Sequence, residues 1–510
     1  MSRRLDWIVG ITLSAAAAAA GASGADGEWL EVPASGFAAV ARDLAPGAQV
    51  RLSGLHDPDA ARSETFVGRR FEIFAPDARL VARDANAERD LARPHDARFR
   101  GAFEGVAGSR VLISVLADGT LRGIAADWTG FSLILPGADG APQVRRVDAA
   151  RRPARPFRCD QAELAGAAVP PVDFDAALRA APPAGTFAGL APAPSYTARV
   201  AIDSDFEFYN LFGDTIDAVE YVADLMAFMS ILYEEEVDTS MQVSYLRLWT
   251  TAVDPWNQSS SICNLFDFGK YWNDNMTGQS RTIAHMMSGK NSGGGVAWRG
   301  VLCNGPFNYD TTGSGCSFTG VGNYGGAYGY TGAMDGDFTY ENPTVVWDLM
   351  ATSHEIGHNF SSKHTHCYAG IGGNPSQVDR CYVNEQSAGD SCNPTTQNWN
   401  VSGCACNPGS SPATLPGPGS TTGGSPGQAN GTVMSYCHLL GGVTANVSYT
   451  MGMGHPWGVA PDRVPAAMLS HVVARAASYP TCLPFVPGSS VLFRHGFENA
   501  STTGWSTAVP

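Results

Sequence analysis

The spacing of apolar side chains divides the chain into a strand-rich first part and a second part in which strands and helices alternate. Residues 26–161 contain the short alternating runs RRFEIF (69–74), RVLISVL (110–116) and FSLIL (131–135), separated by Gly, Asp and Pro. An apolar side chain at every second position turns one face of a strand toward a core, and the residues between the runs favour turns. The pattern predicts a small β-rich unit at 26–161.

The second part, residues 196–485, has both periodicities. Apolar residues recur three and four positions apart in DTIDAVEYVADLMAFMSILYEEE (214–236), PTVVWDLMATSHEIGHNF (343–360) and PDRVPAAMLSHVVARAAS (461–478), which predicts three helices. Strands are predicted at YTARVAID (196–203), at MQVSYLRLW (241–249), and at TIAHMM and GGGVAWRGVLC within 282–303. Strands that alternate with helices indicate an α/β or α+β unit.

Composition marks the boundary between these units and the two ends of the chain. Residues 1–25 begin with arginines, continue with an apolar stretch too short to span a bilayer and end in small residues, which is the order of a secretory signal peptide. Residues 162–195 are rich in Ala and Pro and suit an extended linker that a protease cuts during maturation. Residues 486–510 are expected to form a C-terminal tail. We expect a secreted protein without a stable membrane anchor, and the periplasm and the cell surface are alternative destinations.

The distribution of charge excludes one class of partner. Residues 1–200 contain 23 Lys and Arg and 23 Asp and Glu, so the whole formal charge of -15 lies in residues 201–510. A protein binds nucleic acid largely by neutralising phosphates with Lys and Arg, and an acidic unit has few to offer. We therefore expect neither nucleic acid nor an anionic membrane as a partner.

The cysteines indicate an oxidising compartment. Ten of the 11 cysteines lie between Cys263 and Cys482, and in an exported protein most of them are expected to form disulfides. The pairing of the six cysteines within 367–437 cannot be read from their spacing. Cys159 stands alone in the first half and needs a separate explanation.

The chemistry of the chain is indicated by HEIGHNFSSKH, residues 354–364. His354 and His358 are four residues apart in a predicted helix, so both imidazoles leave the same face and can bind one metal ion. Glu355 lies beside them, where a carboxylate can take a proton from a metal-activated water. His364 is the candidate third ligand, and three protein ligands leave the fourth position of a catalytic zinc open. A sharp turn after about Phe360 is required to bring His364 to the same ion.

This motif, followed by GTVMSYC (431–437), resembles the metzincin clan of zinc metalloproteases, in which a Met-turn lies beneath the metal. Met434 is the methionine of that turn in this sequence. DLMATSHEIGHNF and GGGVAWRGVLC are most similar to the reprolysin or adamalysin group and its bacterial secreted members, over residues 196–485. The resemblance implies a mixed five-stranded sheet on helices, a cleft, one catalytic Zn²⁺ and endopeptidase activity on proteins or peptides. It also allows Ca²⁺, although no acidic loop pattern here calls for it.

The resemblance extends to features around the motif. Residues 103–136 are similar to propeptides of the group, which implies that residues 26–161 act as the protein's own inhibitor and that the protein is made as a zymogen. Many relatives bind the zinc with a propeptide cysteine, and a thiolate is a strong zinc ligand, so Cys159 is a candidate latency switch, with an incidental thiol as the alternative. Cys303 and Cys482 resemble a disulfide of the family. Gly295, Val296, Ala297 and Trp298 lie in a predicted edge strand that offers backbone groups to an extended substrate, with an ordinary covered edge as the alternative.

Two positions depart from the group's pattern. Ser361 replaces the glycine expected where the chain turns, and serine at a positive φ is strained. His366 is therefore the alternative third ligand. Tyr436, two residues after Met434, is absent from reprolysins but has counterparts near the zinc in the astacin and serralysin branches. We predict that Tyr436 approaches the metal or stabilises the oxyanion, with a purely structural tyrosine as the alternative.

Two other functions are alternatives to a peptidase of this kind. The first is a catalytically silent binding or adhesion protein on a metzincin scaffold. The enzyme is favoured over it because the site residues are all present: His354, Glu355, His358, His364 and Met434. A zinc peptidase with a distant glutamate as third ligand is less consistent with the sequence, because His364 already supplies a ligand nearby.

Overall fold

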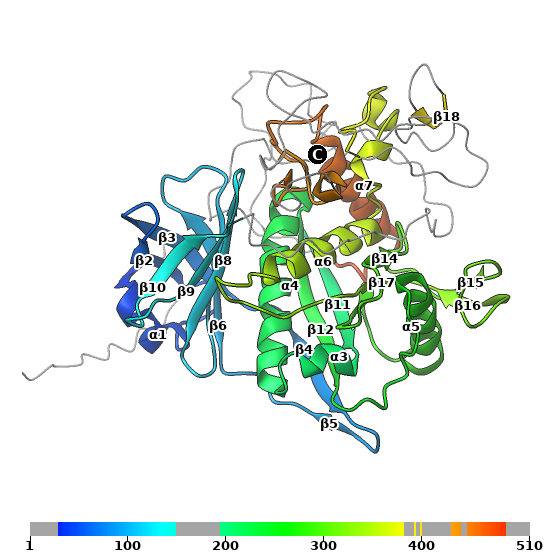
Figure 1. The fold of residues 1–510 in the computed structure, drawn as a ribbon, viewed down its shortest axis with the longest axis horizontal. Helices are drawn as coiled ribbons and strands as arrows, with labels where there is room; N and C mark the ends of the chain where they lie inside the picture. The colour runs from blue at the N-terminus through cyan, green and yellow to red at the C-terminus, as the bar shows by residue number, and fades with distance from the viewer. Residues whose placement is uncertain are drawn as a thin grey trace, which may run out of the picture.

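The computed structural model describes residues 29–148, 194–381, 430–439 and 446–485, together with two short paired strands, β18 (Cys392–Asn393) and β19 (Asn398–Trp399). The predicted signal peptide, Cys159, and nearly all of the predicted linker and tail lie outside the described residues. Figure 1 shows a small barrel beside a larger unit of one sheet and several helices. The long helix α4 (Thr215–Val237) lies between the barrel and that sheet.

The barrel confirms the prediction of a β-rich N-terminal part. Among the described residues, seven strands follow the order β2-β10-β9-β8-β7-β6-β3, and β2 also pairs with β3, which closes the sheet on itself. The short strand β1 (Leu30–Pro33) pairs parallel to β2, and helix α1 (Ala34–Ala41) packs its Phe37 against Phe99 of the barrel core. The strands are β2 (Gln49–Asp57), β3 (Arg62–Phe71), β6 (Ala97–Phe103), β7 (Arg110–Val115), β8 (Leu121–Asp127), β9 (Gly130–Pro136) and β10 (Pro142–Arg146).

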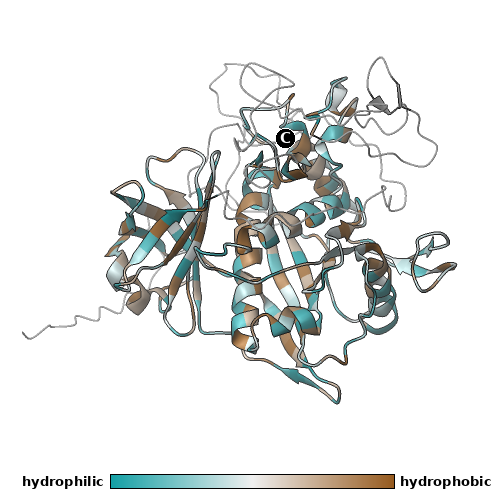
Figure 2. Ribbon diagram, viewed as in Figure 1, coloured by the Kyte–Doolittle hydropathy of each residue, from teal (hydrophilic) through white to brown (hydrophobic). Residues whose placement is uncertain are grey.

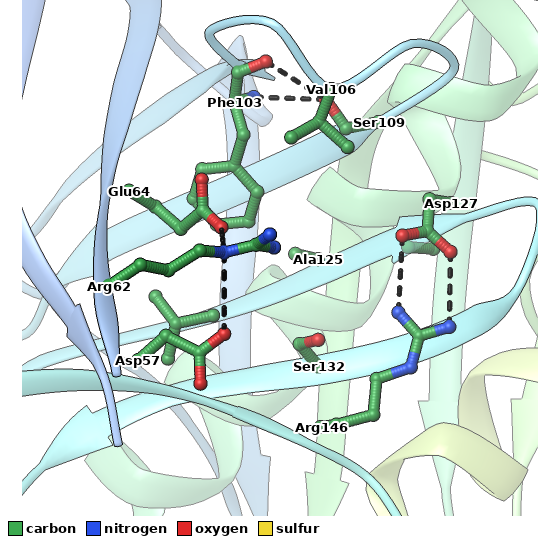
Figure 3. Close-up of a pocket in the computed structure, with 12 residues that line it drawn as sticks. Asp57, Arg62, Glu64, Phe103, Val106, Ser109, Ala125, Asp127, Ser132 and Arg146 are labelled. Atoms are coloured by element: carbon green, nitrogen blue, oxygen red, sulfur yellow. Dashed lines mark hydrogen bonds and ion pairs between the residues drawn. The ribbon is translucent and has the colours of Figure 1, made fainter. Parts of the chain in front are cut away.

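The barrel also contains a pocket lined by charged side chains (Figure 3). Arg62 lies 2.7 Å from Glu64, and Arg146 lies 3.1 Å from Asp127. Asp57 lies 3.9 Å from Arg62, so each charged side chain of the pocket has a partner of opposite charge within the barrel.

The second sheet has the order β14-β17-β13-β11-β12-β4-β5. Its central strands are parallel, and the end strands β14 and β5 are antiparallel to their neighbours. Five strands come from the second part of the chain, as the resemblance implied: β11 (Tyr196–Ser204), β12 (Thr239–Trp249), β13 (Ile283–Met287), β14 (Gly295–Ala297) and β17 (Tyr328–Thr331). The other two, β4 (Phe74–Arg83) and β5 (Glu88–Asp90), come from the N-terminal part. The prediction of a single strand at 69–74 was wrong, because these residues include the end of β3 and the start of β4.

The three predicted helices are α4, α6 (Val345–Asn359) and α7 (Arg463–Ser478). Helix α4 starts where the Asp214 carboxylate accepts hydrogen bonds from the backbone N–H groups of Ile216 and Asp217. Most of its side chains are buried, and Figure 2 shows hydrophobic residues along both α4 and the strands beside it. Helices α3 (Phe206–Asn210) and α5 (Ser261–Asn275) and the hairpin β15 (Phe307–Asp310) and β16 (Val321–Gly325) complete this unit. Short 3₁₀ turns lie at Thr365–Cys367, Ile371–Gly373 and Cys437–Leu439.

Three disulfides join described cysteines: Cys303–Cys482, Cys263–Cys316 and Cys381–Cys437. The first confirms the bridge that the resemblance implied. Within the described residues, no helix has the length and apolar character needed to cross a membrane.

Candidate active site

Helix α6 presents its histidines at its C-terminal end, inside the protein. His354 and His358 lie one turn apart, and both side chains are buried. Their Nε2 atoms are 3.1 Å apart. The helical spacing therefore has the consequence expected from the sequence, since the two imidazoles meet at one point.

His364 completes this group. Its Nε2 atom lies 3.1 Å from Nε2 of His354 and 3.1 Å from Nε2 of His358. Zinc with Zn–N bonds of about 2.0–2.1 Å in a tetrahedral arrangement sets its ligand nitrogens about 3.3 Å apart. The three converging nitrogens therefore fit a metal ion of this kind, and these three histidines form one of two candidate ligand groups among the described residues. The other group contains Asp379, but its two cysteines, Cys381 and Cys437, are joined in a disulfide.

The hydrogen bonds of Nδ1 show which tautomer the rings of His354 and His358 adopt. Nδ1 of His354 lies 2.7 Å from the carbonyl oxygen of Val433, and Nδ1 of His358 lies 2.8 Å from that of Ser362. A carbonyl only accepts, so each Nδ1 donates its proton and each Nε2 keeps its lone pair for a metal. Burial, reinforced by His358 and His364, holds the pKa of His354 well below its usual value, which keeps the ring neutral.

The turn after α6 has the positive φ that the motif requires at position 361, although a serine stands there. Ser361 has a φ of 80°, in the left-handed region, and its N–H bonds to the carbonyl of His358 at 2.8 Å. The turn brings His364 back to the helix despite the missing glycine. The ring of His366 stacks behind that of His364, with centroids 5.4 Å apart, and it is not one of the three converging residues.

Met434 lies in the turn that supports the histidines. The carbonyl of Met434 accepts the N–H of Thr365, next to His364, while Val433 holds His354. The sulfur of Met434 packs so closely on Gly357 that a Cβ atom at position 357 would clash with it. This arrangement explains why a glycine stands between the two histidines of α6.

Glu355 lies against the edge strand β14. Its side chain is fully buried, and a Cβ atom built on Gly295 would lie 2.5 Å from Cγ and 2.6 Å from Cδ of Glu355. The strand stands at one end of the sheet, and the side chains of Val296, Ala297 and Trp298 are buried. The predicted edge strand is thus present beside the predicted general base.

Tyr436 packs on the histidines from the side of the Met434 turn. Its ring centroid lies 4.2 Å from that of His364 and 6.1 Å from that of His354, and only 4% of the residue is exposed. The structure therefore places Tyr436 beside the candidate metal ligands, and its catalytic role stays a prediction.

Asn359 has a structural role that the sequence did not indicate. Its side-chain amide donates to the carbonyls of Trp298 and Tyr328, at 2.8 and 2.9 Å. It thereby fixes the end of α6 to β17 and to Trp298, the residue directly after β14. The sequence shows that Asn359 directly follows His358, but its hydrogen-bond partners come close to it only in the folded protein.

Residues 195–411 match the family model described as metallo-peptidase family M12. This stretch belongs to metallopeptidase family M12. The M12 domain contains the three converging histidines and Glu355, and the chain is accordingly a metallopeptidase. The triad suits the zinc ion of that family.

Comparisons beyond the family model are distant. Metalloproteinase-II from Bacteroides fragilis is similar at 11% identity and a TM-score of 0.33, over 66% of this chain and 89% of that chain. A chaperone–substrate complex is similar at 11% identity and a TM-score of 0.23, over 49% of this chain and 32% of that chain. Direct comparison of the sequence with curated proteins finds no match.

Proposed function

We propose that the protein is an exported zinc-dependent endopeptidase, in which His354, His358 and His364 hold the ion and Glu355 is the general base. The convergence of three buried imidazole nitrogens on one point, with the buried carboxylate of Glu355 next to His354 in the helix, carries this proposal. A zinc ion bound there supplies a Lewis acid and lowers the pKa of a bound water.

The residues of the chain have distinct tasks in peptide hydrolysis. Glu355 accepts the proton of the attacking water and later transfers it to the amine of the leaving group. The carbonyls of Val433 and Ser362 keep His354 and His358 in the ligating tautomer. The stretch Gly295–Trp298 at the end of the sheet is proposed to pair with the backbone of an extended substrate. Substrates of many sequences can bind in this way, because their side chains contribute little to backbone pairing.

Tyr436 is proposed to donate a hydrogen bond to the oxyanion of the tetrahedral intermediate. Its ring lies against His364, and removal of an oxyanion donor lowers kcat by about 100- to 1,000-fold. A Tyr436→Phe variant that keeps the zinc and the wild-type kcat would eliminate this role.

Export and latency complete the proposal. The apolar segment within residues 1–25 and the three disulfides both suit an extracytoplasmic protein. Cys159 is proposed to hold the precursor inactive by binding the zinc as a thiolate. A Cys159→Ala precursor that stays as latent as the uncut wild type would refute the switch.

The proposed activity is tested by metal analysis and digestion of casein or gelatin by the mature protein. We expect one zinc per protein chain and no digestion by Glu355→Ala, which retains the metal ligands. Glu207→Ala is a matched control, because Glu207 lies in the mature part of the chain, where its half-exposed side chain pairs with Lys290 and not with the three histidines. Equal digestion by wild type and Glu355→Ala would overturn the assignment and favour a binding protein on a peptidase scaffold.

A further inference from the structure

The N-terminal unit, residues 29–148, completes the sheet of the M12 domain. Strand β4 pairs parallel to β12, with Leu80 opposite Leu246. The N–H of Val243 bonds to the carbonyl of Ile73, and the N–H of Thr250 bonds to that of Arg83. Strand β5 then pairs with β4, so β12 is an inner strand of the sheet. Without the N-terminal unit, the backbone groups on this side of β12 would lose their partners.

The acidic face of α4 is matched by arginines of the barrel. Asp224, which is 1% exposed, accepts hydrogen bonds from Arg98 at 2.7 Å and from Arg122 at 2.6 Å. Arg110 reaches both Glu235 and Glu236, each at 2.6 Å. Buried charges of this kind need their partners, because an unpaired buried charge is strongly destabilising.

Arg110 also connects the barrel to the active-site helix. It donates to the carbonyl of Tyr449 at 2.6 Å, and the Tyr449 hydroxyl lies 2.8 Å from Oγ of Ser353, the residue before His354. Phe131 of the barrel packs on the same tyrosine, with ring centroids 5.5 Å apart.

The segment that precedes α6 is held in a similar way. The hydroxyl of Tyr340 donates to the carbonyl of Gln143 at 2.7 Å and accepts the N–H of Leu135 at 3.2 Å. The guanidinium of Arg122 lies 4.9 Å from the ring of Phe338. The barrel therefore contacts chain segments on both sides of the active-site helix.

Apolar packing joins the two units as well. The barrel has a small core of its own, but buried residues of the N-terminal unit also belong to the main core around α4. These shared residues are Ile73, Phe74, Leu80, Val81, Leu112, Ile124, Ala126, Phe131, Leu133 and Val147. Exposure of such large apolar side chains to water is unfavourable, so separation of the two units is opposed.

We propose that the N-terminal unit is a lasting structural subunit of the enzyme. When the chain is cut within 149–193, residues 29–148 stay bound to the M12 domain and do not leave as a spent propeptide. The inference goes beyond the proposed function and does not depend on it, because it follows from the shared sheet, the buried ion pairs and the common core.

The test uses the full chain with a site-specific protease sequence placed within 165–190, in a Glu355→Ala background to prevent self-digestion. After cleavage, the protein is diluted to about 10 nM, incubated overnight and passed over a gel-filtration column in 0.15 M and in 1 M NaCl. We expect both fragments to elute with the uncut chain at both salt concentrations, since buried ion pairs are little screened. Separate elution without denaturant would overturn the proposal.

A pair of arginine variants tests the role of charge. Arg122→Met removes a partner of buried Asp224, and we expect association of the cut fragments to weaken by about 30-fold or more. Arg146→Met is the matched control, because Arg146 pairs with Asp127 inside the barrel unit. Equal weakening by both variants would refute the charge matching. None of these measurements depends on peptidase activity. They therefore support or refute the association of the two fragments even if the digestion assay detects no activity.

Discussion

Replacement of Gly295 by alanine is expected to disable Glu355, the proposed general base, without removing the metal. The added Cβ atom would lie 2.5 Å from Cγ and 2.6 Å from Cδ of Glu355, whereas carbon atoms in contact lie about 3.5–4.0 Å apart. Gly295 does not have a positive φ, so alanine suits its backbone. The carboxylate must therefore move by about 1 Å, and a misplacement of that size costs about 100-fold in rate.

The assay is kcat and KM on a fluorogenic peptide, with zinc content and Tm measured on the same samples. We expect kcat to fall by about 100-fold while the zinc content stays at the wild-type level, because the substitution touches none of the three histidines. Gly278→Ala is the matched control, since a Cβ atom there meets nothing within 4 Å. A kcat within about threefold of wild type would refute this reasoning, because it would correspond to less than 1 kcal/mol.

A double variant separates the clash from other effects. Aspartate has a shorter side chain, so in a Glu355→Asp background the alanine at position 295 meets less of it. Gly295→Ala should then cost little additional activity, which gives a strong coupling between the two positions. Additive losses would indicate that Gly295 acts by another route.

Three further outcomes are expected. Ser361→Gly should stabilise the protein by about 1 kcal/mol, seen as a higher Tm, because relief of the strain at a φ of 80° exceeds the entropy cost of glycine. His364→Ala should lose its zinc in metal analysis, whereas His366→Ala should keep it, and the opposite pattern would exchange the two assignments. Burial alone would raise the pKa of Asp224, but Arg122 and Arg98 outweigh it and hold that pKa below its usual value. The stabilisation it gives is therefore present above about pH 4 and lost as the pH falls further, so the Tm difference between wild type and Asp224→Asn should shrink on acidification. A difference independent of pH would contradict this.

The site was more predictable from the sequence than the fold around it. The pair His354 and His358 follows from helical spacing alone, and a residue later in the chain needs only one sharp turn to join them. The sequence also located the strain at Ser361, because the pattern of the motif demands a positive φ at that place. What it left open was the choice between His364 and His366, which depends on where each ring points after the turn.

The unpredicted features depend on contacts between distant parts of the chain. Helix α5 was missed, and the hydrogen bonds of Asn359 to Trp298 and Tyr328 exist only once the helix lies over the sheet. The sequence context of Gly295 likewise gives no sign that this glycine leaves room for the side chain of Glu355. The transfer of β4 and β5 to the second sheet was also invisible, because alternation of apolar residues shows that a strand exists but not which strand it joins.

The pairing of β4 with β12 joins segments that leave the ribosome far apart in time. Pairing between strands so distant in sequence is slow to form, and an uncovered strand edge invites other chains to add to it. In the intact protein β4 is made first and is present when β12 emerges. A gene fragment that starts at residue 195 lacks this partner throughout folding, so it is expected to produce insoluble aggregates where the full-length gene produces soluble enzyme.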